Sequence, residues 1–260
     1  MKLELEGKSV LITGASKGIG LSTARAFAAE GCSLHLAARS KPELEANRDS
    51  IMGEFGVDVQ VHAGDLSDTA VLDKLGAACA DVDILVNNAG DIPAGDIVSV
   101  SDTAWRKGWD LKVHGYIYLT RLLYPRMQAR GSGVIVNDIG NSGENWDANY
   151  IAGASGNASL MAFTRALGGV SLDHGVRVVG VNPGPVATDR MIKMMKRRAT
   201  DWYGDDSRWE ELNDKYPGKR PATPEEVADL IVFLSSVRAG YITGTIVTID
   251  GGIASRRSII

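Results

Sequence analysis

Short apolar runs alternate along the chain with longer segments in which apolar residues recur at helical spacing. Runs of the first kind predict buried strands, and segments of the second kind predict helices that cover a sheet. The expected strands are Ser9–Thr13, Ser33–Ala37, Val59–Ala63, Ile84–Asn87, Val134–Asn137, Arg177–Asn182 and Thr245–Ile249. The expected helices are Ile19–Glu30, Pro42–Phe55, Thr69–Cys79, Trp105–Arg126, Ala154–Leu172 and Pro224–Val237. The alternation predicts an α/β fold, a doubly wound seven-stranded parallel sheet with helices on both faces.

Length and composition fit a single domain over residues 1–260, because 44% hydrophobic and 23% charged residues are ordinary for a globular core. The formal net charge of −4 creates no field that would gather phosphate backbones, so we expect a small-molecule partner and no nucleic acid. The chain shows no secretory stretch and no apolar run long enough to cross a bilayer, which predicts a cytoplasmic protein without a membrane partner. Cys32 and Cys79 have no CxxC spacing and no histidine cluster in the sequence, so we expect buried packing residues, no disulfide and no metal site.

Residues 189–220, between the sixth strand and the last helix, do not fit a strand–helix unit. Because ligands of open α/β sheets bind beyond the carboxyl ends of the strands, we expect this insertion to form a lid over the substrate. Its first part interleaves apolar with basic side chains, namely Met191, Ile192, Met194 and Met195 with Lys193, Lys196, Arg197 and Arg198. That composition suits an apolar substrate with an anionic group, and the alternative is an amphipathic helix with a solvated basic face.

The first strand runs directly into Gly14-Ala15-Ser16-Lys17-Gly18-Ile19-Gly20, and a helical pattern follows. Gly14 permits a tight turn, Gly18 lets backbone N–H groups approach a pyrophosphate, and Gly20 allows close packing of helix and strand. A plain turn is the alternative, but the flanking strand and helix favour a dinucleotide site.

The spacing Gly-x-x-x-Gly-x-Gly resembles that of the short-chain dehydrogenase/reductase family. Further motifs agree along essentially the whole chain: Asp65 and Leu66, Asn88-Ala89-Gly90, Pro183-Gly184-Pro185-Val186 with Thr188, and the final Asp250-Gly251-Gly252. The resemblance implies a single-domain Rossmann fold and an oxidoreductase. It also implies cofactor contacts at Gly14, Ser16, Lys17, Gly18, Ile19, Gly20, Asp65, Leu66, Asn88, Ala89, Gly90, Pro183, Gly184, Val186 and Thr188.

The end of the second strand bears on the choice of cofactor. An acidic residue there would bind the ribose hydroxyls of NAD, but this chain has Arg39, and Lys17 in the glycine turn adds a second cation. A guanidinium pairs well with a phosphate, so the sequence favours NADP(H) over NAD(H). A solvated basic helix entrance is the alternative.

The family's catalytic residues are a serine, a tyrosine, a lysine four residues after it and an asparagine in the preceding long helix. Matching the helix around Phe163 by register puts Gly140, Gly153, Asn157 and Lys112 at these four positions. The resemblance therefore implies an atypical catalytic tetrad. Two functions follow: an oxidoreductase with displaced acid–base residues, or a nucleotide-binding protein that acts as a sensor or partner subunit. A non-redox enzyme of the same fold is a third possibility that no residue supports.

Three residues are candidates for the displaced roles. Tyr150 precedes Gly153 by nearly one helical turn, so a helix that starts earlier carries it on almost the same face. Lys112 can return the missing positive charge, and Ser142 or Asn141 can supply a hydrogen bond to a substrate oxygen. Each residue also has an alternative without a catalytic role. Tyr150 can simply anchor the helix, and Ser142 can be an ordinary loop residue. Lys112 can be solvated or paired with Asp110 or Asp138.

The resemblance also implies a homo-oligomer, either a dimer or a homotetramer, in which the helices expected at Trp105–Arg126 and Ala154–Leu172 pair between subunits. The small residues Gly153, Ala154, Gly156 and Ala158 would permit close approach of such helices.

Overall fold

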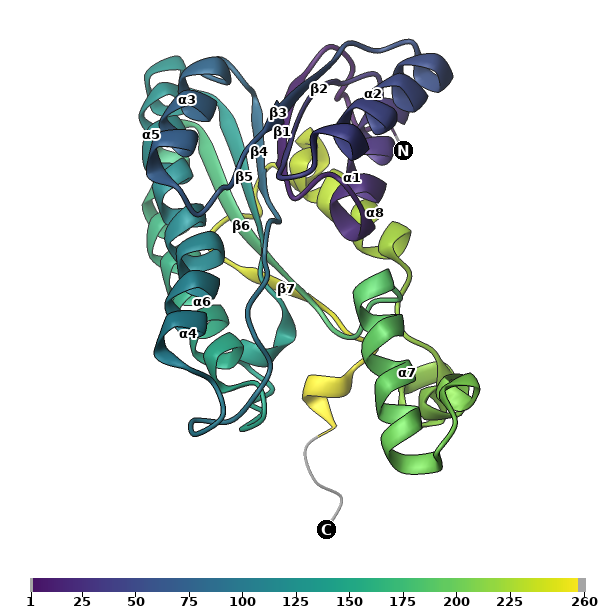
Figure 1. Ribbon diagram of the computed structural model, residues 1–260. Coiled ribbons are helices and arrows are strands. Elements are labelled where there is room, and N and C mark those ends of the chain that lie inside the picture. The colour runs from purple at the N-terminus through teal and green to yellow at the C-terminus, as the bar shows by residue number, and fades with distance from the viewer. Residues whose placement is uncertain (1, 257–260) are drawn as a thin grey trace.

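The computed structural model describes residues 2–256, and its centre is one sheet of seven parallel strands (Figure 1). Their order is β3-β2-β1-β4-β5-β6-β7, which confirms the predicted doubly wound sheet. The strands are β1 Ser9–Thr13, β2 Ser33–Ala38, β3 Val59–Ala63, β4 Ile84–Asn87, β5 Gly133–Asp138, β6 Val176–Pro183 and β7 Ile246–Ile249.

Helices cover both faces of the sheet because alternate residues of each central strand enter different cores. In β4, Ile84 and Val86 pack with α1, α2 and α8, whereas Leu85 packs with α3 and α5. Figure 1 shows these two layers on opposite sides of the sheet. The α-helices are α1 Gly18–Ala29, α2 Lys41–Phe55, α3 Thr69–Ala78, α4 Asp102–Trp109, α5 Gly115–Arg130, α6 Ile151–Ser171, α7 Asp189–Tyr203 and α8 Pro224–Ser235.

Two helices differ from their predicted course. The helix expected at Trp105–Arg126 is divided into α4 and α5 by one π-helical turn, Asp110–His114, which carries Lys112. Such turns occur often at functional sites. The helix expected to begin at Ala154 begins at Ile151, so Tyr150 is its N-cap residue.

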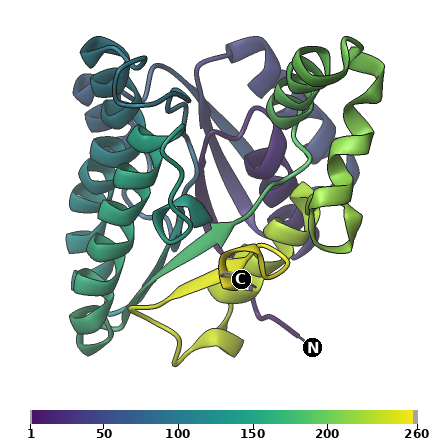
Figure 2. The same ribbon diagram turned by 90° about the horizontal axis from the view of Figure 1, so that it is seen from below.

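The segment 189–220 forms a lobe with a small core of its own. After α7 come two 3₁₀ segments, Asp206–Lys215 and Pro217–Lys219. Met191 and Met195 are buried there with Leu212, while the basic side chains of α7 are exposed. Figures 1 and 2 show this green lobe on the same side of the sheet as α1 and α8. The amphipathic alternative therefore describes α7, whose Met191 and Met195 pack inside the lobe and whose basic side chains face outward.

The small residues of α6 are mostly turned toward the chain itself. Gly153, Ala154 and Gly156 are buried, and Ala158 is exposed. A Cβ on Gly156 would meet Val113 Cγ2 at 3.0 Å, so this glycine serves packing within the chain. The predicted close approach to a partner helix at Gly153, Ala154 and Gly156 is therefore wrong. Within residues 2–256, no helix combines the length and apolar character needed to traverse a bilayer.

Candidate functional site

The turn after β1 has the shape that a bound pyrophosphate requires. Gly14 and Gly18 have φ angles of +69° and +57°, and a Cβ on Gly14 would lie 2.9 Å from the Cα of Ala89. A Cβ on Gly20 would overlap the carbonyl oxygen of Gly14, so helix and strand touch there. Lys17 is the N-cap of α1 and provides no side-chain cap, and the first turn contains no acidic residue. The first N–H groups of α1 thus have no anionic or capping side chain in front of them, and this turn fits a dinucleotide phosphate.

Loops that follow two other strands, β4 and β6, converge on this turn. The hydroxyl of Thr13 accepts hydrogen bonds from the backbone N–H groups of Asn88 (2.9 Å) and Ala89 (3.1 Å). From the far side, the Thr188 methyl carbon lies 3.2 Å from the position that a Cβ on Gly18 would take. The fold therefore brings together motifs that are 170 residues apart in numbering (188 − 18).

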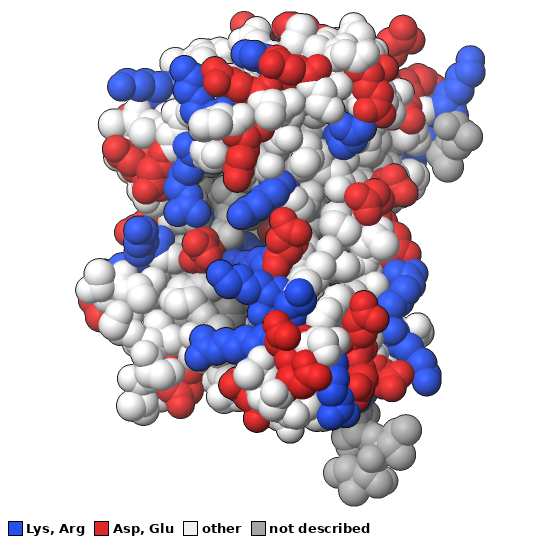
Figure 3. Space-filling view, turned by 45° about the vertical axis from the view of Figure 1, so that its right-hand side comes forward, with Lys and Arg blue, Asp and Glu red and all other residues white. Residues whose placement is uncertain are grey.

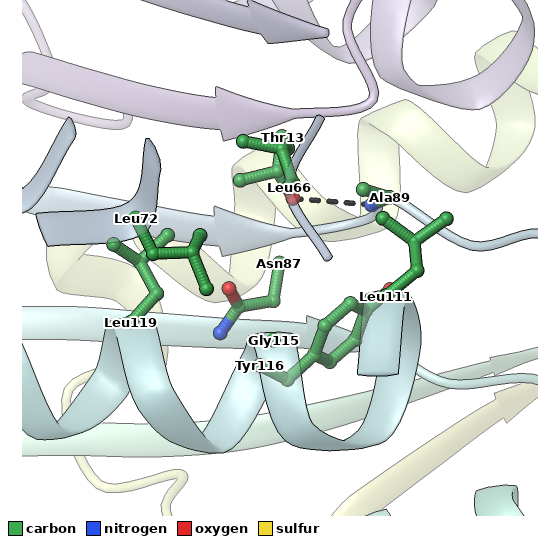
Figure 4. Close-up of a pocket in the computed structure, with 9 residues that line it drawn as sticks. All are labelled: Thr13, Leu66, Leu72, Asn87, Ala89, Leu111, Gly115, Tyr116 and Leu119. Atoms are coloured by element: carbon green, nitrogen blue, oxygen red, sulfur yellow. Dashed lines mark hydrogen bonds between the residues drawn. The ribbon is translucent and has the colours of Figure 1, made fainter. Parts of the chain in front are cut away.

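A small, mostly apolar pocket underlies these loops (Figure 4). Leu111 and Tyr116 line it from the π-helical turn and α5, Leu66 from the loop after β3, and Asn87 from the end of β4. The Asn87 amide donates to Asn137 Oδ1 at 2.9 Å, so its polar end is satisfied between β4 and β5. This floor holds the strand ends in register beneath the predicted dinucleotide position.

Three further predicted cofactor contacts, Asp65, Ser16 and Ile19, also make contacts within the protein. Asp65 Oδ1 accepts from the backbone N–H (3.1 Å) and the hydroxyl (2.8 Å) of Ser67, and these bonds lower the pKa of the Asp65 carboxyl. The carbonyl of Ser16 accepts from the Asn47 amide at 2.9 Å, while Ile19 packs against the core.

The predicted contacts on the nicotinamide side lie around the end of β6. Pro183 is the last residue of that strand, and Gly184 donates its N–H to the carbonyl of Ile249 at 2.9 Å. Val186 is buried and forms an isolated bridge with Ala222. Thr188 caps α7 by accepting from the N–H of Met191 at 3.4 Å.

Basic side chains gather around the hollow in the middle of the face shown in Figure 3. Arg39 and Lys17 are exposed, as a phosphate-binding role requires. Arg39 lies 3.7 Å from Asp91, and the same carboxylate lies 3.4 Å from Arg190 at the start of α7. Asp91 thus links Arg39, the residue predicted to bind the 2′-phosphate of the cofactor, to Arg190 in the first turn of the lid segment.

Tyr150 occupies the space that a side chain at position 153 would need. A Cβ built on Gly153 would overlap the Tyr150 ring, with Tyr150 Cδ1 at 2.6 Å and two further ring atoms closer. Burial raises the pKa of the Tyr150 hydroxyl, and the guanidinium of Arg190 opposes that rise. The phenol is therefore protonated at neutral pH and lies over the helix turn where the family tyrosine is expected.

Lys112 reaches the end of β5. Its side chain passes Gly90, and its ammonium donates to the carbonyl of Ile139 at 2.5 Å. Burial lowers the pKa of Lys112 to about 8, with the carboxylate of Asp138 opposing the shift. Burial also raises the pKa of Asp138 to about 6, and here Lys112 opposes. Lys112 was alternatively expected to be solvated or paired with Asp110 or Asp138. The structure couples it electrostatically to Asp138, whereas the Asp110 carboxylate is hydrogen-bonded to His114.

Asn157, which stands at the expected lysine position, organises the loop after β5. Its amide nitrogen donates to the Gly140 carbonyl (3.2 Å) and to the Ser142 hydroxyl oxygen (2.7 Å). Because Ser142 accepts this bond, its own O–H remains able to donate to a ligand. Asn141 is instead directed to Asp250 Oδ2, at 3.2 Å. Gly153 and Asn157 are separated by four residues of α6, so they lie about 6 Å apart along the helix axis.

Arg190 is a site residue that sequence reasoning missed. It donates to the carbonyl of Ile92 at 2.9 Å, and it is the cation that acts on Tyr150. Lys112, which was expected to return the missing positive charge, is not among the charges that shift the pKa of Tyr150. The sequence placed Arg190 only in the lid, and its contact with Ile92 spans 98 residues.

Comparison with known proteins covers nearly the whole chain. A family model described as enoyl-(acyl carrier protein) reductase matches residues 14–254. Galactitol 2-dehydrogenase (L-tagatose-forming) of Cereibacter sphaeroides is 34% identical over 257 residues, 95% of each chain. Meso-2,3-butanediol dehydrogenase of Serratia marcescens is 31% identical over 259 residues, 96% of each. A crystal structure of L-sorbose reductase from Gluconobacter frateurii with NADPH and L-sorbose superposes with a TM-score of 0.92 at 34% identity, covering 100% of both chains.

Proposed function

Because the chain belongs to the short-chain dehydrogenase/reductase family, we propose that it interconverts a ketone and an alcohol with NADP(H), using Tyr150 as the proton donor. Its relatives are dehydrogenases and reductases, and the chain is accordingly an NAD(P)-dependent oxidoreductase of alcohols and ketones.

The position of the Tyr150 ring carries the proposal. A side chain at position 153 would start where this ring lies, so Tyr150 delivers a hydroxyl from the N-cap of α6 to the same part of the proposed active site. Reduction of a ketone requires a protonated acid beside the carbonyl oxygen, and a tyrosine whose pKa is raised by burial remains protonated at neutral pH. The substitution at 153 thus relocates the acid.

Three further side chains support this role. The Ser142 hydroxyl donates to the substrate oxygen, because the bond that it accepts from Asn157 leaves its O–H available. Arg190 stabilises the tyrosinate that remains after proton transfer, and Lys112 supplies a second cation at the end of β5. When bound, the nicotinamide cofactor supplies or accepts the hydride.

Arg39 and Lys17 favour NADP(H) in this proposal. A 2′-phosphate at the end of β2 would meet the guanidinium of Arg39, whose ion pair to Asp91, at 3.7 Å, is exposed. Exposed pairs of this kind contribute little free energy, so a phosphate can displace the carboxylate. The similar L-sorbose reductase structure contains NADPH, which agrees with this choice.

We propose a small hydroxylated ketone or the corresponding alcohol as substrate. The named relatives act on galactitol, L-sorbose and meso-2,3-butanediol, all of which carry a hydroxyl beside the reacting carbon. The lobe at 189–220, within a single domain, forms the lid over this substrate, and the active form is a homo-oligomer. Light scattering of the purified protein distinguishes a dimer from a tetramer.

The test is turnover of a panel of ketoses and small hydroxyketones, followed by NADPH absorbance. Tyr150→Phe is expected to lower kcat by about 10²–10⁴-fold, the usual contribution of a positioned acid, with NADPH affinity unchanged. Lys112→Met is expected to lower kcat as well. The matched control is Tyr118→Phe, which removes an exposed hydroxyl bonded to Asp73 (2.8 Å) and should leave kcat as in the wild type.

Two results would contradict the proposal in different ways. Wild-type kcat in Tyr150→Phe means that another group donates the proton. NADPH binding without turnover of any ketone or alcohol supports the nucleotide-binding protein that acts as a sensor or partner subunit.

A further inference from the structure

Three potential metal ligands converge at the β3 edge of the sheet, away from the residues of the proposed active site. His35 Nδ1 lies 3.0 Å from His62 Nε2, and Cys79 Sγ lies 3.7 Å from the same nitrogen. All three donor atoms lie within 4.8 Å of one another. No sequence motif marks this cluster, because its members are separated by 27 and 17 residues.

The fold itself creates this convergence. In β2, Leu34 and Leu36 enter the core on the side of α1, so His35 between them faces the side of α3. The parallel register places His62 of β3 opposite Ala37, two positions along the same face. Cys79 is the C-cap of α3, the helix that covers this face, and it is buried.

Hydrogen bonding alone satisfies this group poorly. A neutral imidazole nitrogen without a proton has one lone pair, yet both His35 Nδ1 and Cys79 Sγ are directed at His62 Nε2. Only one of the two can donate to it well. A cation between the three atoms would be shared by all of them.

We propose that His35, His62 and Cys79 form a zinc site, with water as the fourth ligand. With Zn–N near 2.0–2.1 Å and Zn–S near 2.3 Å, tetrahedral ligands lie roughly 3.3 Å (N to N) and 3.6 Å (N to S) apart. The observed 3.0 Å and 3.7 Å are close to these spacings, and small side-chain rotations bring the third pair within reach. Nitrogen and thiolate ligands select zinc over magnesium or calcium.

The surroundings are compatible with a dication. Both histidines are partly exposed, which leaves room for a water ligand, and the carboxylate of Asp58 acts electrostatically on His35. As the Zn–S bond forms, the S–H bond of Cys79 breaks and its proton passes to solvent. No electron is transferred.

The experiment uses the full chain stripped with a chelator and titrated with Zn²⁺ against a chromophoric competitor. We expect one Zn²⁺ per chain and a rise in the midpoint of thermal unfolding on binding. Co²⁺ in place of Zn²⁺ should give thiolate-to-metal charge-transfer absorption. Cys79→Ser and His62→Gln should lose the bound metal, and Cys79→Ser should lose the charge-transfer band.

Cys32→Ser and His174→Gln are the matched controls. Cys32 is the other buried cysteine of the chain, and its thiol is directed to the Leu5 carbonyl at 3.3 Å. Both controls should bind zinc as the wild type does. The proposal is overturned if the wild type binds no zinc, if its Co²⁺ form shows no thiolate band, or if Cys79→Ser and His62→Gln both keep the metal. The Co²⁺ spectrum of the wild type decides the matter even if a variant fails to fold.

Discussion

Adding one methyl group at Gly153 tests whether the placement of the Tyr150 ring matters for catalysis. In Gly153→Ala the new Cβ would lie 2.6 Å from Tyr150 Cδ1 and nearer still to two other ring atoms. Carbon atoms in contact prefer about 3.5–4.0 Å, so the ring must move by at least about 1 Å. Misplacement of a catalytic group by about 1 Å can cost about 10²-fold in rate. We therefore expect kcat of Gly153→Ala to fall by about two orders of magnitude.

The same change should leave the fold intact. The ring is the far end of a side chain that can rotate, and alanine is a better helix former than glycine by about 0.5–1 kcal/mol. Gly169→Ala is the matched control, because Gly169 lies in the same helix and a Cβ added there would meet nothing within 4 Å. That control should gain stability and keep wild-type kcat.

The assay combines steady-state kinetics, NADPH titration and urea unfolding for both variants. The expected pattern is a loss of kcat at unchanged NADPH affinity and undiminished free energy of unfolding in Gly153→Ala alone. The reasoning is refuted if Gly153→Ala keeps wild-type kcat while Tyr150→Phe does not, since the position of the ring would then be irrelevant.

Three further outcomes follow from charges in the site. Arg39→Ala should weaken NADPH binding by about tenfold or more, the worth of a charge-assisted hydrogen bond, and leave NADH binding unchanged in fluorescence titrations. Arg190→Met should raise the pKa of Tyr150, because Arg190 lowers it, and so move the pH profile of alcohol oxidation to higher pH. Folding lowers the pKa of Lys112 from 10.5 to about 8, so the unfolded chain binds more protons between these values. Stability should therefore rise with pH across that window, and Lys112→Met should abolish the rise in urea unfolding.

The strands were predictable because each central strand is buried on both faces, which leaves a continuous apolar run such as Ile84–Asn87 in the sequence. The division of the long helix at Asp110–His114 was not, because a π turn adds one residue without changing composition. The start of α6 was placed three residues late, since Ile151, Ala152 and Gly153 carry no capping signal that distinguishes a first helical turn.

The site was predictable where its parts are local in sequence. The glycine turn follows from spacing. Tyr150 was expected inside a helix that starts earlier, but it lies against Gly153 from the non-helical N-cap position of α6. Arg190 and the cluster around His62 were not predictable, because their contacts arise only when distant segments meet: the loop after β4 with α7, and β3 with the end of α3. No hydrophobic period and no sequence motif predicts contacts of this kind.

The buried charges near the site favour an active enzyme over a scaffold that only binds nucleotide. Lowering the pKa of Lys112 from 10.5 to about 8 corresponds to roughly 3 kcal/mol against its charged form, at about 1.4 kcal/mol per unit. Burial likewise raises the pKa of Asp138 to about 6 and so works against its carboxylate form. A site without a catalytic role would not require the Lys112–Asp138 pair, because apolar residues of equal volume often make a protein more stable than a buried ion pair does. Lys112 instead ends at the Ile139 carbonyl, one residue before Gly140, where Asn157 and Ser142 complete the hydrogen-bonded loop. The charge is thus kept at the end of the sheet where the substrate carbonyl is expected.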